Sequence, residues 1–210
     1  MWRAHGLGAE CVDGWVACSG TPPRFYPNVV TVNPKIDPQD QMRSIAERLA
    51  RASGAFFVKD SYRALALDSL GFEPLFDGRW IYRPPVLAAS ATRLNWRPVT
   101  DAEELDAWEA SWGGLANKPP LFLPEFLARP GITMLAGRAD SAIVAGCIIT
   151  ATGAVAGLSN VFGDPLEVIS AATTTFSGRG LVGYENGDAL ASAIDAGFQT
   201  VGDLVVWKRP

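Results

Sequence analysis

A succession of strands and helices that occurs twice is the feature that most limits what this chain can fold into. Residues 33–38 (NPKIDP) are similar to residues 160–165 (NVFGDP), about 127 positions later. Residues 70–74 (LGFEP) match residues 196–200 (AGFQT) at almost the same offset. Two unrelated runs of alternating strands and helices are the competing explanation. The repeat therefore predicts an internal duplication, with that alternative left open.

The local patterns predict the elements of each copy. Asp37-Pro38 and Asp164-Pro165 each begin a helix, because Asp is a favoured N-cap and Pro fits the first helical position. We also expect a short helix over residues 61–70, and a three-stranded antiparallel meander over residues 133–162. Helices joined to strands by short links predict an α/β (α+β) fold with a mixed twisted sheet and flanking helices.

Composition excludes several classes of function. Apolar residues make up 48% and charged residues 19%, which is enough for a packed core, and the net charge is −4. No cluster of Lys and Arg occurs, so we expect no nucleic-acid partner. His5 is the single histidine, which excludes a Ser-His-Asp triad and a multi-histidine metal site. We therefore expect no metal.

The cysteines and the apolar segments predict a location. Cys11, Cys18 and Cys147 have no CxxC spacing, which indicates reduced thiols in the cytoplasm. The N-terminus has no continuous apolar region of the kind found in a signal peptide. Residues 142–162 are weakly polar but are interrupted by Gly, Thr, Ser and Asn, so two strands and a turn are expected there instead of a membrane span. The expected partner is a small-molecule ligand, with a homodimer as a further possibility.

The C-terminal part of the chain resembles the acyl-CoA N-acyltransferase (GNAT) superfamily. Asn186, Ala189, Gly197 and Phe198 occupy the places of that family's N-x-x-A and G-F positions. The resemblance covers the second half in element order, and the first half resembles only the back part of the fold. It implies a degenerate tandem: a partial unit over residues 1–85, a linker over residues 86–93 and a near-complete domain over residues 94–210.

The resemblance implies a cofactor site. The family splays two parallel strands, here residues 154–162 and 181–184, and the pantetheine arm of acetyl-CoA pairs with the first of them. The resemblance therefore assigns cofactor-binding roles to five residues: Asn160, Val161, Phe162, Gly163 and Asn186. Asn160 has an alternative role, which is to close a turn with its own backbone.

The sequence departs from the family pattern at two positions of the second half. Where the family has a glycine-rich phosphate loop, this chain has Gly163-Asp164-Pro165; Asp164 adds negative charge and Pro165 lacks an N–H donor. The family's proton-donating tyrosine falls at Ala193, which has no proton to give. Both departures count against efficient catalysis.

Glu185 and Tyr184 are the candidate catalytic residues, as general base and proton donor, with Tyr26 as an alternative donor. The alternative interpretation is a solvated Glu185 at a strand end and a half-buried Tyr184 in the sheet. The predicted function is acyl-CoA-dependent N-acetylation of a small-molecule or peptide amine, with impaired catalysis. The competing prediction is a catalytically inactive ligand-binding or dimerisation module of the same fold.

Overall fold

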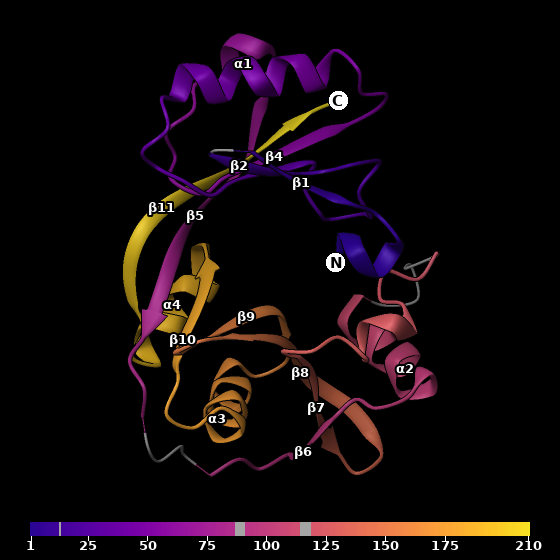
Figure 1. Cartoon of the computed structure of the whole chain (residues 1–210). Coiled ribbons are helices and arrows are strands. Elements are labelled where there is room, and N and C mark those ends of the chain that lie inside the picture. The colour runs from indigo at the N-terminus through magenta and orange to yellow at the C-terminus, as the bar shows by residue number, and fades with distance from the viewer. Residues whose placement is uncertain (13, 87–90, 114–118) are drawn as a thin grey trace. The chain divides into compact units, whose positions relative to one another are not determined.

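The computed structural model describes residues 1–12, 14–86, 91–113 and 119–210, in two compact units (Figure 1). The first unit comprises Met1–Arg79 and Gly202–Pro210, and the second comprises Trp80–Val201. Strands β5 (Glu73–Arg83) and β11 (Gln199–Arg209) each contribute one end to either unit. The first unit is therefore completed by the C-terminal end of β11, which is remote in sequence, whereas the second unit is one continuous segment. Part of the predicted linker, residues 87–90, lies outside the described residues.

The first unit is a mixed sheet with one long helix. Its strands follow the order β1 (Ala9–Val12), β2 (Trp15–Cys18), β3 (Val29–Thr31), β4 (Phe56–Asp60), β11. The pairs β1–β2, β2–β3 and β4–β11 are antiparallel, whereas β3 and β4 are parallel. Helix α1 (Pro38–Leu49) connects the two parallel strands, and 3-10 turns cover Trp2–His5 (η1) and Leu67–Leu70 (η2).

Helix α1 begins where the sequence predicts it. The Gln39 N–H donates to the Asp37 carboxylate at 2.8 Å, and Pro38 takes the first helical position. Its apolar face carries Ile45, which is fully buried in a core with Val29 and Val58 of the parallel strands. The helix is thus held by burial of one face against the sheet.

The prediction of a helix over residues 61–70 is wrong for residues 61–66. Only the 3-10 turn Leu67–Leu70 forms. The cause is the buried carboxylate of Asp60, which accepts the backbone N–H groups of Tyr62 at 3.3 Å and Leu65 at 2.8 Å. Arg63 takes a left-handed conformation at φ 51°, which a helix does not allow. The polar network at the end of β4 therefore overrides helix propensity.

The second unit contains the predicted meander. Its strands follow the order β5, β10 (Gly180–Glu185), β9 (Val155–Phe162), β8 (Ala142–Thr152), β7 (Ile132–Ala139), β6 (Asn95–Pro98). Strands β6 to β9 pair antiparallel in sequence order, and β10 pairs parallel to β9. The helices are α2 (Ala102–Gly113), α3 (Pro165–Thr175), α4 (Gly187–Asp195) and the 3-10 turn Pro124–Phe126 (η3). The expected strands over residues 142–162 are confirmed.

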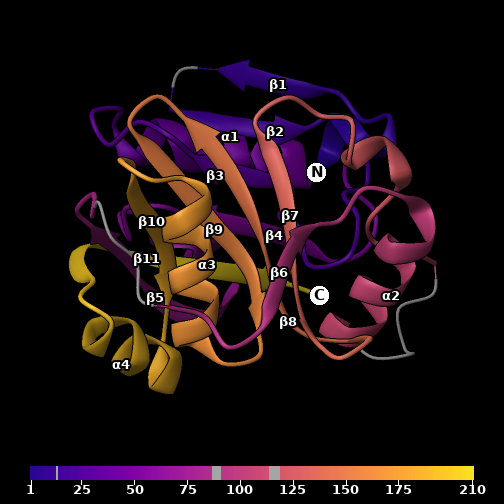
Figure 2. The same cartoon turned by 90° about the horizontal axis from the view of Figure 1, so that it is seen from below.

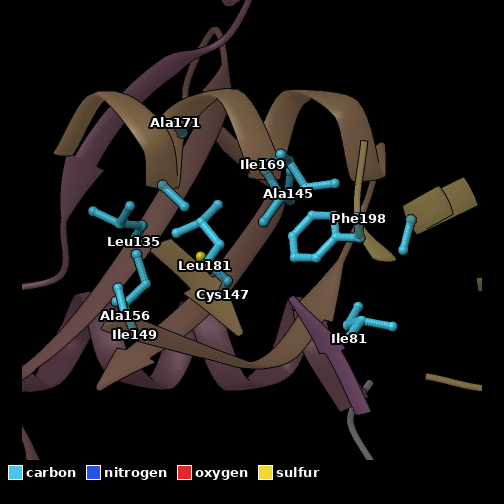
Figure 3. Packing of buried hydrophobic residues seen from close by; sticks show 13 residues of the cluster. Ile81, Leu135, Ala145, Cys147, Ile149, Ala156, Ile169, Ala171, Leu181 and Phe198 are labelled. Carbon is cyan, nitrogen blue, oxygen red and sulfur yellow. The ribbon is translucent and has the colours of Figure 1, made fainter. Parts of the chain in front are cut away.

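Helices α2 and α3 use different residues of the same strands, because side chains alternate across a sheet. Helix α3 packs on β8 and β9 (Figure 2) over a core that includes Leu135, Cys147 and Leu181 (Figure 3). Helix α2 packs on β8, and the Trp108 indole N–H donates to the Leu135 carbonyl at 2.9 Å. The site described below depends on both packings, since α3 and the aromatic residues near α2 flank the same end of β9.

The element order β3-α1-β4-η2-β5 corresponds to β9-α3-β10-α4-β11. Both runs contain one parallel strand pair bridged by a helix that starts with Asp-Pro. They differ in the second connection, which is a 3-10 turn in the first run and helix α4 in the second. The duplication itself stays a prediction, because agreement in element order does not establish common origin.

Candidate functional site

The parallel strands β9 and β10 pair for three residues and then separate. The pairing runs from Gly180 opposite Val155 to Val182 opposite Gly157, and it ends there. Beyond that point β9 continues beside β8, so its other edge faces β10 without a ladder. The two strands therefore form an open wedge at their carboxyl ends, at the place where the resemblance predicts a splay.

A β-bulge in β9 accompanies the separation. Ser159 lies opposite Ile148 and Phe162 lies opposite Gly146, so one more residue of β9 than of β8 fills the interval. Asn160 sits in this interval with a left-handed φ of 52°. A bulge bends the strand that carries it and increases its local twist. Asn160 thus belongs to a bulge that bends β9 just beyond the residues at which its pairing with β10 ends.

The wedge opens into a cavity of about 250 Å³. Its wall is mostly apolar and comes from β9, β10, α3, α4 and the strand ends at positions 81 and 198: Ile81, Leu158, Val161, Phe162, Gly163, Pro165, Ile169, Gly183, Glu185, Ala189, Ala193 and Phe198. A cavity of this kind, with few polar groups on an apolar wall, is typical of small-molecule sites.

Glu185 is the one ionisable residue among those that line the cavity. It is half-buried at the end of β10, and burial raises the pKa of its carboxyl group. Gly183 lines the same cavity, as expected for a residue two positions away on a strand. The arrangement can hold a proton acceptor against an apolar ligand.

Tyr184 points to the opposite face of β10, because neighbouring side chains of a strand alternate. Its ring lies edge-on to Trp80, with ring centroids 5.5 Å apart. Burial raises the pKa of its hydroxyl, and the nearby Glu185 charge adds to the effect. The two candidate catalytic residues are therefore sequence neighbours on different faces, and only Glu185 lines the cavity.

The predicted cofactor-binding residues divide in the same way. Val161, Phe162 and Gly163 line the cavity, whereas Asn160 forms the bulge. Asn186 is exposed at the N-cap of α4, and its side chain makes no capping hydrogen bond. Sequence reasoning placed the wedge but missed the walls made by α3, α4 and β5, because nothing in their local sequence marks those residues as neighbours.

Phe162 holds one wall in place through aromatic packing. Its ring is edge-on to Trp108, with centroids 5.1 Å apart. A Cβ atom on Gly146 would lie 2.5 Å from both the Phe162 ring and the Trp108 indole nitrogen. Because no side chain fits there, Gly146 is the residue that lets the Phe162 ring pack against Trp108.

The end of α3 beside the cavity is already occupied by the chain's own charges. The Asp164 carboxylate accepts the Leu166 N–H at 3.0 Å and the Arg93 guanidinium at 2.8 Å. Glu167 is 6% exposed and accepts the Arg93 and Leu94 N–H groups as well as the Arg93 Nε–H. The Arg93 backbone N–H is the largest cause of the low pKa of Glu167, about 2.

These contacts test whether acetyl-CoA fits. The apolar wedge suits a pantetheine arm, but a pyrophosphate needs free N–H donors at the helix start. Pro165 has no N–H, and the Leu166 N–H is capped by Asp164. The residues at the start of α3 therefore do not fit the pyrophosphate of acetyl-CoA.

The corresponding strands of the first unit are closed. Beyond the paired residues of β3 and β4, the Thr31 hydroxyl donates to the Asp60 carboxylate at 3.4 Å and accepts the Ser61 N–H at 2.8 Å. Asp60 is completely buried. This network ties the two strand ends together, so the wedge of the second unit has no equivalent here among the described residues.

A larger hollow of about 540 Å³ lies in the first unit beside the last turn of α1, but it is a weaker candidate. Arg48 on its wall is paired with Glu10 and stacks on the Trp15 ring at 4.5 Å. The charge of Arg48 is thus already neutralised within the unit. We therefore take the wedge of the second unit as the functional site.

Two negative findings apply to the part of the chain that the structure describes. None of its His, Cys, Asp and Glu residues gather in a group of three able to hold a metal ion. None of its helices has the length and apolar character needed to cross a bilayer.

Comparison with solved structures identifies the fold. A GCN5-related N-acetyltransferase from Kribbella flavida superposes with a TM-score of 0.64 at 14% identity, over 100% of this chain and 94% of that one. A conserved protein from Staphylococcus epidermidis gives 0.69 at 11% identity, over 97% and 94%. A tandem GNAT protein from the clavulanic acid biosynthesis pathway gives 0.54 at 14% identity, over 86% and 74%. No family model and no curated protein matches the sequence. The chain therefore has the GNAT fold, as predicted.

Proposed function

We propose that the second unit is an N-acyltransferase that moves an acyl group, acetyl in the simplest case, from a thioester to the amine of a small molecule or peptide. The observation that carries the proposal is the wedge between β9 and β10, with the carboxylate of Glu185 on its apolar wall. The free edge of β9 can pair with an extended thioester arm as an added strand would. The GNAT fold supports the same reaction class.

The residues supply a simple mechanism. The amine nitrogen attacks the thioester carbonyl, the C–N bond forms and the C–S bond breaks, while Glu185 accepts the proton lost by the amine. Its raised pKa makes its carboxylate a stronger base than an exposed glutamate. Ala193 offers no proton to the departing sulfur, but a thiol of pKa about 8.5 can leave as the thiolate and be protonated by water.

The experiment is thiol release from acetyl thioesters in the presence of a panel of amines. Glu185→Gln should lower the rate by about 10² or more, the usual contribution of a general base. Asp188→Asn is the matched control, because it changes an exposed acid at the start of α4 that lies outside the cavity lining. The wild-type rate should fall as the pH drops through the raised pKa of Glu185. Equal rates for the two variants would contradict the proposal.

A non-catalytic ligand-binding module is the second candidate, favoured by two observations at the same site. Ala193 lines the cavity where the resemblance implies a proton donor, and the start of α3 is capped by Asp164. This alternative predicts thioester binding without thiol release at any pH, and equal binding by wild type and Glu185→Gln. Turnover that depends on Glu185 would exclude it.

A further inference from the structure

The first turn of α3 in the second unit has almost no capacity to bind an anion. Pro165 at the first helical position lacks an N–H, and the Leu166 N–H is used by the Asp164 carboxylate at 3.0 Å. The third residue of the turn, Glu167, carries a charge of the same sign as a phosphate. Free N–H groups usually allow a helix start to bind phosphate. Here the first of them is missing and the second is bonded to the chain's own carboxylate.

The cation that contacts this end of α3 is engaged as well. Arg93 contacts Asp164 through its terminal nitrogen at 2.8 Å and Glu167 through Nε at 3.0 Å. Two carboxylates and one guanidinium leave a net negative charge at this end of α3. Gly163 and Pro165 belong to the cavity wall, so the negative cluster borders the site where a bound donor would emerge. A nucleotide with three phosphate groups would be repelled there.

The wedge itself carries no such obstacle. Except for Glu185, its lining is uncharged and mainly apolar. The cavity accepts a neutral chain, and Glu185 lies on β10, on the side of the wedge opposite β9. Strands β9 and β10 are separated, as the family resemblance implies. The place of the phosphate loop is taken by the ion cluster of Arg93, Asp164 and Glu167.

We propose that the donor for this site is a phosphate-free thioester, an acyl group on a neutral pantetheine- or cysteamine-type thiol, and that the nucleotide portion of coenzyme A adds nothing to binding. This inference rests on the proposed acyltransfer function and names its donor class. The bonds made and broken are those given above: the amine nitrogen gains the acyl group, and the neutral thiol leaves as its thiolate.

The test is calorimetric titration of the whole protein with S-acetylpantetheine and with acetyl-CoA. We expect S-acetylpantetheine to bind at least as tightly as acetyl-CoA. Acetyl-CoA binding tenfold tighter would mean about 1.4 kcal/mol from the nucleotide, and it would overturn the inference while leaving the acyltransferase proposal standing. Binding of neither thioester at millimolar concentration would overturn both.

A gain-of-binding variant gives an independent readout. The single change Asp164→Asn removes one negative charge beside the cavity and keeps an oxygen able to cap the helix, and Asp164 is not part of the cavity lining. It should tighten acetyl-CoA binding severalfold and leave the Kd of S-acetylpantetheine unchanged, which also reports that the wedge is intact. Asp188→Asn, the same charge change at the start of α4, should alter neither Kd. An unchanged acetyl-CoA Kd in an intact Asp164→Asn variant would overturn the inference.

Discussion

Replacing Glu167 by Gln tests the ion cluster that fixes the start of α3. The carboxylate accepts the Arg93 N–H at 3.0 Å, the Leu94 N–H at 3.3 Å and the Arg93 Nε–H at 3.0 Å. The side-chain amide of the variant would direct an N–H donor toward the N–H groups of Arg93 and Leu94, and the negative charge of the carboxylate would be lost. A pKa lowered from 4.5 to about 2 corresponds to about 3 kcal/mol, and solvent screening at Arg93, whose side chain is 80% exposed, reduces this to about 2 kcal/mol.

Thermal and urea unfolding at several pH values measure the effect. A loss of about 2 kcal/mol should lower Tm by about 4–8 °C near pH 7 for a chain of this size. Because the folded pKa of Glu167 is depressed, its stabilisation is present above pH 4.5 and is lost as the pH falls toward 2. The difference in unfolding free energy between wild type and Glu167→Gln should therefore decrease as the pH falls from 4.5 toward 2.

Glu125→Gln is the matched control, since Glu125 is exposed in the 3-10 turn before β7. It should change stability by less than about 0.5 kcal/mol at every pH. A Glu167→Gln effect as small as that of the control, or a gap that stays constant between pH 5 and pH 2, would refute the reasoning.

Two further substitutions test how the wedge is built. Gly146→Ala should lower the free energy of unfolding in urea by about 1–3 kcal/mol and displace Phe162. The added Cβ would lie 2.8 Å from the Leu135 carbonyl oxygen and against two aromatic rings. Gly157→Ala is the control and should cost little, because the nearest atom to its Cβ would be 3.6 Å away. Asn160→Gly should keep the bulge and thioester binding, whereas Asn160→Val should lose about 1–2 kcal/mol at φ 52° and weaken binding in calorimetry. Equal unfolding free energies for Gly146→Ala and Gly157→Ala would argue against a packing role for Gly146. Equal stability and thioester binding of the two Asn160 variants would argue against a role of Asn160 in the bulge.

Local sequence is a good guide where one short-range interaction decides the outcome. The Asp-Pro signals at residues 37 and 164 mark the starts of α1 and α3, because an Asp cap and a Pro at the first position act within one turn. The same reasoning fails over residues 61–66, where the buried Asp60 carboxylate takes the backbone N–H groups that a helix would need. That carboxylate is buried at the end of β4, where the Thr31 hydroxyl of β3 donates to it.

The candidate site was predictable only where local sequence motifs locate its residues. The resemblance located the diverging strands and the positions of Glu185 and Ala193, both of which line the cavity. It did not reveal that Tyr184 faces away from Glu185, nor that Arg93 ties the segment before β6 to the start of α3. Side-chain facing depends on register, and the ion cluster joins residues about seventy positions apart.

The sequence by itself determined most of the element types, the starts of α1 and α3, the meander and the absence of a phosphate loop, since these follow from residue chemistry over a few positions. Only the tertiary structure decided which strand end completes which unit, which of the two parallel pairs stays open, and what lines the opening. Those outcomes depend on burial and on hydrogen bonds between distant segments. Asp60 closes one strand pair and the bulge at Asn160 opens the other.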